Sequence, residues 1–259
     1  MHTLSFALDL LLAVYVVWEV AQFLSRYRQL KQAVLKGDAQ ARARIYYIVL
    51  AFEWTSALLA LAALGFDWTK LNPKFLDLQA MPLIQLFSQG GIDRAILTGL
   101  LVGIVAGTVG AIAVRLRAKR RGVAPAANAP APRWRKLLPD FSALLPVTGR
   151  ERLLWAAVAI SAGICEEVMF RGWLLTTLHG TLNLNGWALL LIAAALFGLA
   201  HVYQGITGVV LTSFGGLFFC FLYVVTGSLL VPILLHALVD VRFAFLPAPR
   251  AHKPQAAFA

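Results

Sequence analysis

Long apolar stretches constrain this chain more than any other feature of its sequence. Seven of them lie near residues 4–24, 45–64, 95–116, 152–178, 187–203, 208–226 and 229–247. A helix needs about 20 mostly apolar residues to cross a bilayer. The chain is also 60% hydrophobic, with a mean hydropathy of +0.75, well above the roughly 45–50% apolar content of an average soluble domain. The sequence therefore predicts an all-α, polytopic integral membrane bundle of about seven transmembrane helices.

Basic residues outnumber acidic residues by 23 to 12, which gives a formal net charge of +11. In a soluble protein this balance would suggest nucleic acid. Most of the excess, however, lies in two segments between apolar stretches, residues 26–44 and 115–152. Such loops fix the topology of membrane proteins and touch anionic headgroups. Membrane lipid is therefore the expected partner, and nucleic-acid binding is not expected.

The same charge asymmetry predicts the orientation of the chain. The loop after the first span is far more basic than the loop after the second, so we expect it to be cytoplasmic. Because the number of spans is odd, the N-terminus is then outside and the C-terminus cytoplasmic. We expect a multi-pass protein of a bacterial inner (plasma) membrane.

Composition divides the chain into four parts. Residues 117–149 combine basic residues with Ala-Pro repeats, a composition that favours extended chain and cannot bury a core. We interpret this segment as a cytoplasmic linker between a three-helix membrane unit, residues 1–116, and a four-helix C-terminal core, residues 150–247, which a tail of residues 248–259 follows. No internal repeat relates the two units, which disfavours an inverted-repeat transporter.

Charged residues lie within the apolar stretches of the C-terminal core. Glu166, Glu167, Arg171 and Asp240 would together oppose membrane insertion by roughly 10 kcal/mol if they faced lipid, so we expect them to face the bundle interior. Glu167 and Arg171 are four residues apart and can form an ion pair on one helix face. Glu166 points about 100° away and has no partner at that spacing, so it is free to act as a general base or acid.

Two further apolar stretches carry polar pairs at the same spacing. Phe197 and His201 share one helix face, and Gly198 beside them allows a close helix approach. His236 and Asp240 form the second pair. Three helices thus each donate polar groups, which favours a site, although a buried ion-pair network that only fixes packing is the alternative reading.

The expected depths of these residues test whether they can meet. At a rise of about 1.5 Å per residue, Glu166 and His236 lie near one level of the membrane, whereas His201 lies about 10 Å closer to the cytoplasmic side. A tilt or a later helix start must close that gap.

Other ionisable residues in apolar surroundings carry weaker signals. Glu53, Asp9 and Glu19 are single acids near helix ends or interfaces, for which snorkelling or packing is the expected role. Cys165 adjoins Glu166, but a cysteine buried in apolar surroundings is usually inert.

Three spaced patterns occur in order on three predicted membrane helices: Glu166-Glu167-x-x-x-Arg171, Phe197-x-x-x-His201 and His236-x-x-x-Asp240. Their types and order resemble the motifs of the CAAX protease and bacteriocin-processing family, the type II CAAX prenyl endopeptidases and their bacterial relatives. Each pattern alone would be weak, but three in order are specific. The resemblance covers about residues 150–247, and the N-terminal three helices resemble no family.

The resemblance implies proteolysis inside the membrane. The resemblance assigns Glu166 as the base that activates water, with His201 beside it. It assigns His236 and the residue at position 240, here Asp240, to stabilising the oxyanion. Glu167 and Arg171 would hold the helix, and Phe197 would support the site. One departure concerns Asp240, because the family's last motif often ends in Asn, which can donate a hydrogen bond. Asp240 either orients His236, as a carboxylate positions a catalytic imidazole, or is protonated.

Metal dependence is a separate question. Glu166, His201 and His236 could supply one Glu and two His ligands to zinc with an open position, but the chain has no H-E-x-x-H pair. On the resemblance, metal-free water activation is favoured and no cofactor is expected, with zinc as the alternative.

The leading hypothesis is thus an intramembrane endopeptidase that cleaves a membrane-associated, prenylated or leader peptide. Its substrate, a peptide or protein, would enter from the bilayer. The alternatives are a zinc-dependent version of the protease and a non-catalytic membrane binding or bacteriocin-immunity protein of the same fold. Complete motifs favour the enzyme.

Overall fold

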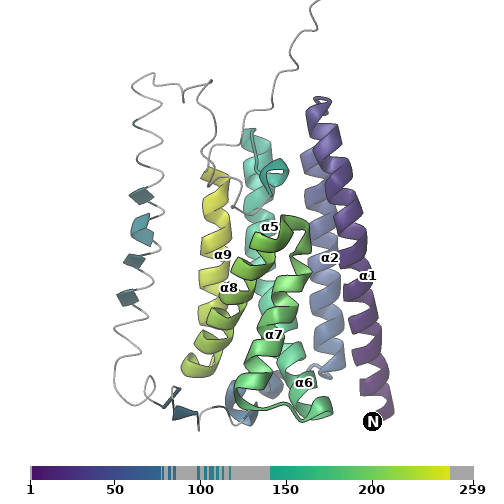
Figure 1. The fold of residues 1–259 in the computed structure, drawn as a ribbon, viewed down its shortest axis with the longest axis vertical. Helices are drawn as coiled ribbons and strands as arrows, with labels where there is room; N and C mark the ends of the chain where they lie inside the picture. Colours follow the sequence, from purple (N-terminus) through teal and green to yellow (C-terminus); the bar gives the residue numbers. More distant parts are fainter. Residues whose placement is uncertain are drawn as a thin grey trace, which may run out of the picture.

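The computed structural model describes residues 2–76 and 141–245, together with isolated positions between 78 and 117. The described residues form helices joined by short turns, with no strand among them, which confirms the predicted all-α class (Figure 1). Its α-helices are α1 (His2–Leu35), α2 (Ala41–Ala63), α5 (Gly149–Glu167), α6 (Leu175–Leu182), α7 (Gly186–Ala200), α8 (Gly205–Thr226) and α9 (Leu230–Val241). The predicted span 95–116 is described only at isolated positions, and residues 118–140 and 248–259 lie outside the described part.

Short helices of other types occur between and after these elements. The 3-10 helices are η1 (Trp68–Leu71), η2 (Pro73–Leu76), η5 (Ser142–Leu144), η7 (Val202–Gln204) and η8 (Arg242–Phe245), and η6 (Val168–Leu174) is a π-helix between α5 and α6. Residues 141–149, the end of the expected linker, therefore have ordered structure. Tyr46 of α2 donates a hydrogen bond to the carbonyl oxygen of Leu144, which anchors η5 on the bundle.

Four helical segments of the described chain are long and apolar enough to cross a membrane. They are Phe6–Leu35, Ala41–Ala63, Gly149–Leu182 and Val202–Thr226, and they agree with four of the predicted spans. The other two are shorter than expected, because α7 has 15 residues and α9 has 12, fewer than the roughly 20 of a full span. α7 ends directly before His201, and α9 ends directly after Asp240.

The segment from α5 through η6 to α6 is one continuous helical run with defined ends. It begins in a capping box, in which the Thr148 hydroxyl accepts a hydrogen bond from the Glu151 backbone and the Glu151 carboxylate accepts from the Thr148 backbone. It ends where Asn183 adopts a left-handed conformation, with φ of 51°. A tight turn then leads into α7.

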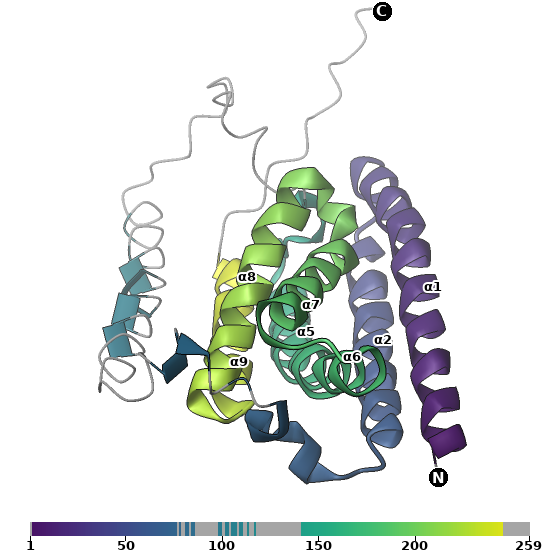
Figure 2. The same cartoon turned by 60° about the horizontal axis from the view of Figure 1, so that its bottom comes forward.

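The run through α5 lies at the centre of the bundle. In Figures 1 and 2, α1 and α2 lie side by side to one side of it, while α8 and α9 lie to the other. α2 packs directly on α5, and α5 packs on α9. The two helices α5 and α9, which carry motif residues, thus contact each other, and α2 packs on α5 as well.

Two glycines let these helices approach closely. A Cβ added at Gly163 of α5 would lie 2.8 Å from the backbone nitrogen of Ala237 on α9, and one at Gly198 of α7 would lie 2.6 Å from the carbonyl oxygen of Val209 on α8. Backbone atoms at these distances cannot move aside. The close approach predicted for Gly198 is therefore confirmed, and Gly163 provides a second one that brings α9 against α5.

Candidate active site

The buried charges of the first motif form an ion pair at the start of the π-helix. Arg171 Nη1 lies 3.0 Å from Glu167 Oε1, and both side chains are 0% exposed. Arg171 Nη2 also donates to the carbonyl oxygen of Gly216 at 2.9 Å, and its guanidinium lies 4.6 Å from the ring centre of Phe197. The predicted pairing of Glu167 with Arg171 is confirmed. π-helical turns within α-helices are rare and often occur at functional sites.

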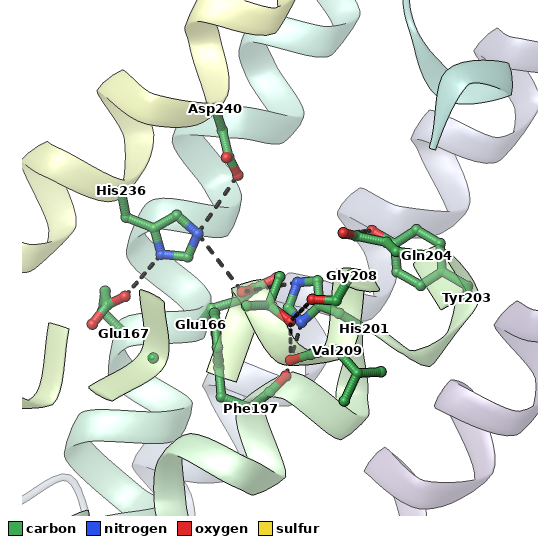
Figure 3. Close-up of polar contacts among 12 residues, drawn as sticks. Glu166, Glu167, Phe197, His201, Tyr203, Gln204, Gly208, Val209, His236 and Asp240 are labelled. Atoms are coloured by element: carbon green, nitrogen blue, oxygen red, sulfur yellow. Dashed lines mark hydrogen bonds and ion pairs between the residues drawn. The ribbon is translucent and has the colours of Figure 1, made fainter. Parts of the chain in front are cut away.

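Glu167 has a second partner on α9, which the sequence did not indicate. Its Oε1 lies 2.8 Å from His236 Nδ1, and because a carboxylate only accepts, Nδ1 donates. The Nε2 atom of His236 therefore points the other way. There it lies 3.5 Å from Asp240 Oδ2 and 3.8 Å from Glu166 Oε2 (Figure 3). The carboxylate that orients His236 through Nδ1 is thus Glu167, while Asp240 lies beside the opposite nitrogen.

His201 directly follows the last residue of α7. Its Nδ1 donates to the carbonyl oxygen of Phe197 at 2.9 Å, so the neutral ring carries its proton there and presents an unprotonated Nε2. That Nε2 lies 4.0 Å from Glu166 Oε2. Phe197 supports the ring as well, with the two ring centres 4.8 Å apart.

Glu166 lies between the two histidines but is bonded to neither. Distances of 3.8 and 4.0 Å from its Oε2 to the two Nε2 atoms exceed hydrogen-bond length. This oxygen is buried and has no hydrogen-bond partner among the described residues. The side chain of Glu166 is 20% exposed, whereas that of Glu167 is 0% exposed. Glu166 is thus the carboxylate of the pair that is free to react, as the helix periodicity predicts.

His201 lies at the same level as Glu166, so the offset of about 10 Å expected from the sequence is wrong. The reason is that the run Gly149–Leu182 has 34 residues and is therefore about 50 Å long. Depth cannot be counted from its first residues as if it just filled the membrane. Counted instead from the turn between α6 and α7, the segments 166–182 and 186–201 are of nearly equal length. Glu166 and His201 are therefore at nearly equal distances from this turn and lie at the same depth.

These groups border a cavity of about 400 Å³. Its polar wall includes Glu166, His201, His236 and Asp240, and much of the remaining wall is apolar, with Phe52 of α2 as one example. All six ionisable residues of the three motifs are thus brought together. Glu167 and Arg171 lie behind the wall, and the other four line it.

The fit of a metal ion is limited by the spacing of these donors. Both imidazoles present Nε2 toward Glu166, which suits zinc chemically. Neighbouring ligands of a tetrahedral zinc, however, lie about 3.3 Å apart, given Zn–N and Zn–O bonds of about 2.0–2.1 Å, whereas the two distances here are 3.8 and 4.0 Å. Within the described residues, no group of three His, Cys, Asp or Glu side chains has the geometry of a metal site.

Sequence reasoning missed two acids of the cavity, Glu19 of α1 and Glu53 of α2. Glu53 of α2 lines it together with the motif residues and is 4% exposed. It is therefore not a snorkelling side chain. Glu53 lies in the middle of α2 and not near a helix end as expected from the sequence, and nothing in the sequence indicated that α2 packs on α5.

Together these features define a class: an integral membrane helical bundle with an acid–base cluster that lines a cavity between its helices. Comparison with known protein families agrees with this class over part of the chain. Residues 148–242 match the model of the type II CAAX prenyl endopeptidase Rce1-like family, so this segment carries the domain that the three motifs predict. The match includes every motif residue and indicates a membrane endopeptidase of the CAAX type. No curated protein and no solved structure matches the chain.

Proposed function

We propose that this protein is an intramembrane endopeptidase in which Glu166 is the general base. The observation that carries the proposal is the free Oε2 of Glu166, which faces the Nε2 atoms of two histidines across 3.8 and 4.0 Å. Separations of this length suit a bridging water. A water held there would contact the base and an unprotonated imidazole nitrogen at once.

The first step of the proposed reaction forms the tetrahedral intermediate. Glu166 takes a proton from the water, and the water oxygen attacks the carbonyl carbon of the scissile peptide bond. His201 accepts a hydrogen bond from the same water through Nε2, because Nδ1 is already committed to the carbonyl of Phe197. The carbonyl oxygen of the substrate then carries the negative charge.

His236 is proposed to stabilise that charge. Glu167 holds its Nδ1, and Nε2 is bordered by Glu166 and Asp240, so three carboxylates favour the imidazolium form. Its Nε2–H then donates to the oxyanion, which is the role of an oxyanion-hole donor. Asp240, adjacent to Nε2, restrains the ring or, when protonated, provides a second donor.

Collapse of the intermediate completes the reaction. The C–N bond breaks, and the proton on Glu166 passes to the leaving nitrogen. The products are a carboxylic acid and an amine, which exchange a proton to give a carboxylate and an ammonium. Arg171 neutralises Glu167 throughout, so that Glu167 can hold His236 without becoming a competing base.

The environment suggests the substrate class and the topology. A cavity with largely apolar walls between membrane helices suits a membrane-associated peptide, such as a prenylated tail or a leader peptide. We further propose the orientation given by the basic loops, with the N-terminus outside and the C-terminus cytoplasmic, in a bacterial inner (plasma) membrane. Residues 1–116 would form a membrane unit and residues 117–149 a linker, both of which precede the protease core of residues 150–247.

The experiment that tests the proposal compares membrane peptides from cells that express the wild type with those from cells that express Glu166→Ala. We expect discrete peptides that depend on Glu166, together with uncleaved precursors in the variant. Asp38→Asn is the control, because Asp38 is an acid in the loop between α1 and α2 and does not line the cavity. Identical peptide profiles for wild type and Glu166→Ala would instead favour the non-catalytic alternative.

A further inference from the structure

Glu53 is an acid of the cavity for which the proposed reaction has no use and which has no ion pair among the described residues. It lies on α2, outside residues 148–242 of the family match. Its side chain is buried, at 4% exposure, and Oε2 has no hydrogen-bond partner among the described residues. The Ser161 hydroxyl of α5 lies close enough to influence the Glu53 carboxyl, although neither this hydroxyl nor Glu53 Oε2 is within hydrogen-bond geometry of a partner among the described residues. Packing alone does not account for a carboxyl placed in this way.

The other cavity acids have either an ion-pair partner or a place in the proposed reaction. Glu19 pairs with Arg26 at 2.7 Å, and Glu166 and Asp240 both face Nε2 of His236. For Glu53, the described residues show no ion pair. It nevertheless lies near enough to Glu166 for their charges to interact, so it belongs to the same end of the cavity.

A peptide inside this cavity has a specific need that Glu53 can meet. Where no bulk water is available, each backbone N–H of the peptide must find an acceptor within the protein. An extended segment at the scissile bond cannot satisfy its own N–H groups. A buried oxygen without a partner on the cavity wall is an acceptor of the required kind.

We infer that Glu53 is a substrate-binding residue, whose free carboxyl oxygen accepts a hydrogen bond from a backbone N–H of the peptide. This inference rests on the proposed function and extends it, because it gives the N-terminal membrane unit a part in the site. α2 then forms a peptide-binding wall, and α5, α7 and α9 provide the reacting groups. The interaction is with the backbone, so it serves peptides of differing side chains.

The test measures KM and kcat separately, with a fluorogenic farnesylated peptide that ends in a CAAX sequence as the probe. Glu53→Met keeps the volume of the side chain but has no oxygen, and we expect it to raise KM about tenfold with kcat within twofold. Glu53→Gln keeps one acceptor oxygen and should restore KM to within about twofold of wild type. Ser56→Ala is the matched control, because Ser56 lies on the same helix, is 1% exposed and has an equally unpartnered hydroxyl, yet does not line the cavity.

A second measurement separates binding from catalysis. Binding of the same peptide is measured to Glu166→Gln protein, which does not turn it over, and to the Glu53→Met/Glu166→Gln double variant. About tenfold weaker binding to the double variant supports the inference. Because this assay needs no turnover, failure of the wild type to cleave peptides would overturn the proposed function and leave the role of Glu53 testable.

Other results would overturn the inference. Unchanged KM and unchanged binding in Glu53→Met would show that no bond to the substrate is lost. A shift of the acid limb of the pH–rate profile in Glu53→Gln, at constant KM, would show that Glu53 acts through its charge on Glu166. Equal losses of thermal stability in Glu53→Met and Ser56→Ala, without a change in KM, would show a role in packing alone.

Discussion

Arg171→Ala should strongly destabilise the protein, because it leaves Glu167 as a buried charge without its cation. Both side chains are completely buried, and the two charged groups are 3.0 Å apart. The arginine also donates to the carbonyl oxygen of Gly216 and lies over the ring of Phe197. Truncation therefore removes an ion pair, a hydrogen bond and a cation–π contact in one step.

The magnitude follows from what remains around Glu167. Removal of one partner of a buried ion pair costs about 3–5 kcal/mol of unfolding free energy. His236 still donates to Glu167 at 2.8 Å, which compensates part of the lost charge and favours the lower end, about 3 kcal/mol. Since whole domains are stable by only about 5–15 kcal/mol, the variant should also be less abundant in the membrane.

Equilibrium unfolding in mixed detergent micelles measures this loss, and quantitative immunoblotting measures abundance. Arg44→Ala is the matched control, because Arg44, exposed in the first turn of α2, pairs with Asp38 of the preceding loop. Its hydrogen bond to Asp38 holds the pKa of that carboxyl below its usual value. We expect this control to leave the unfolding midpoint unchanged. Glu167→Gln/Arg171→Met, which removes both charges, should recover much of the stability. If Arg171→Ala proved as stable and abundant as the wild type, the buried pairing would be refuted.

Three further predictions follow from the site and its supports. His236→Ala should lower kcat by roughly 10² to 10³ with little change in KM. Elemental analysis of active wild-type protein should find no stoichiometric metal. About one zinc per chain, lost in His236→Ala, would instead establish the zinc-dependent mechanism. Gly163→Ala should lower the unfolding free energy by about 1–3 kcal/mol and reduce activity, because its Cβ would lie 2.8 Å from the backbone nitrogen of Ala237; wild-type stability would show that α5 and α9 are not in close contact. A reporter fused after Ala259 should be cytoplasmic, and an extracytoplasmic signal would contradict the orientation.

Local patterns in the sequence predicted the parts of the site that lie on single helices. The four-residue spacing of Glu167 and Arg171 predicted their ion pair, since side chains at that spacing share a helix face. The cost of charge in an apolar helix predicted that the motif residues face the interior. These arguments need only helix geometry and the membrane, so they hold without knowledge of how the helices pack.

Contacts between helices could not be predicted in the same way. The bond from His236 to Glu167 and the position of Glu53 both depend on which helix faces of α2, α5 and α9 meet. The level of His201 depends on the length of the run Gly149–Leu182, which extends beyond what a membrane span requires. The π-helix after Glu167 was also not foreseeable, because apolar periodicity does not distinguish it from an α-helix. The first two features arise from tertiary packing, whereas the level of His201 follows from the length of one helical run.

The central claim, that Glu166 is the base, is tested most directly by the turnover of purified Glu166→Gln in lipid. The amide keeps the shape of the side chain and the neighbouring distances, but it cannot take a proton from water. With the farnesylated CAAX peptide as substrate, we expect turnover to fall at least about 10²-fold while the unfolding midpoint stays close to that of the wild type. Turnover within tenfold of the wild type would contradict the account, because another group would then have to activate the water.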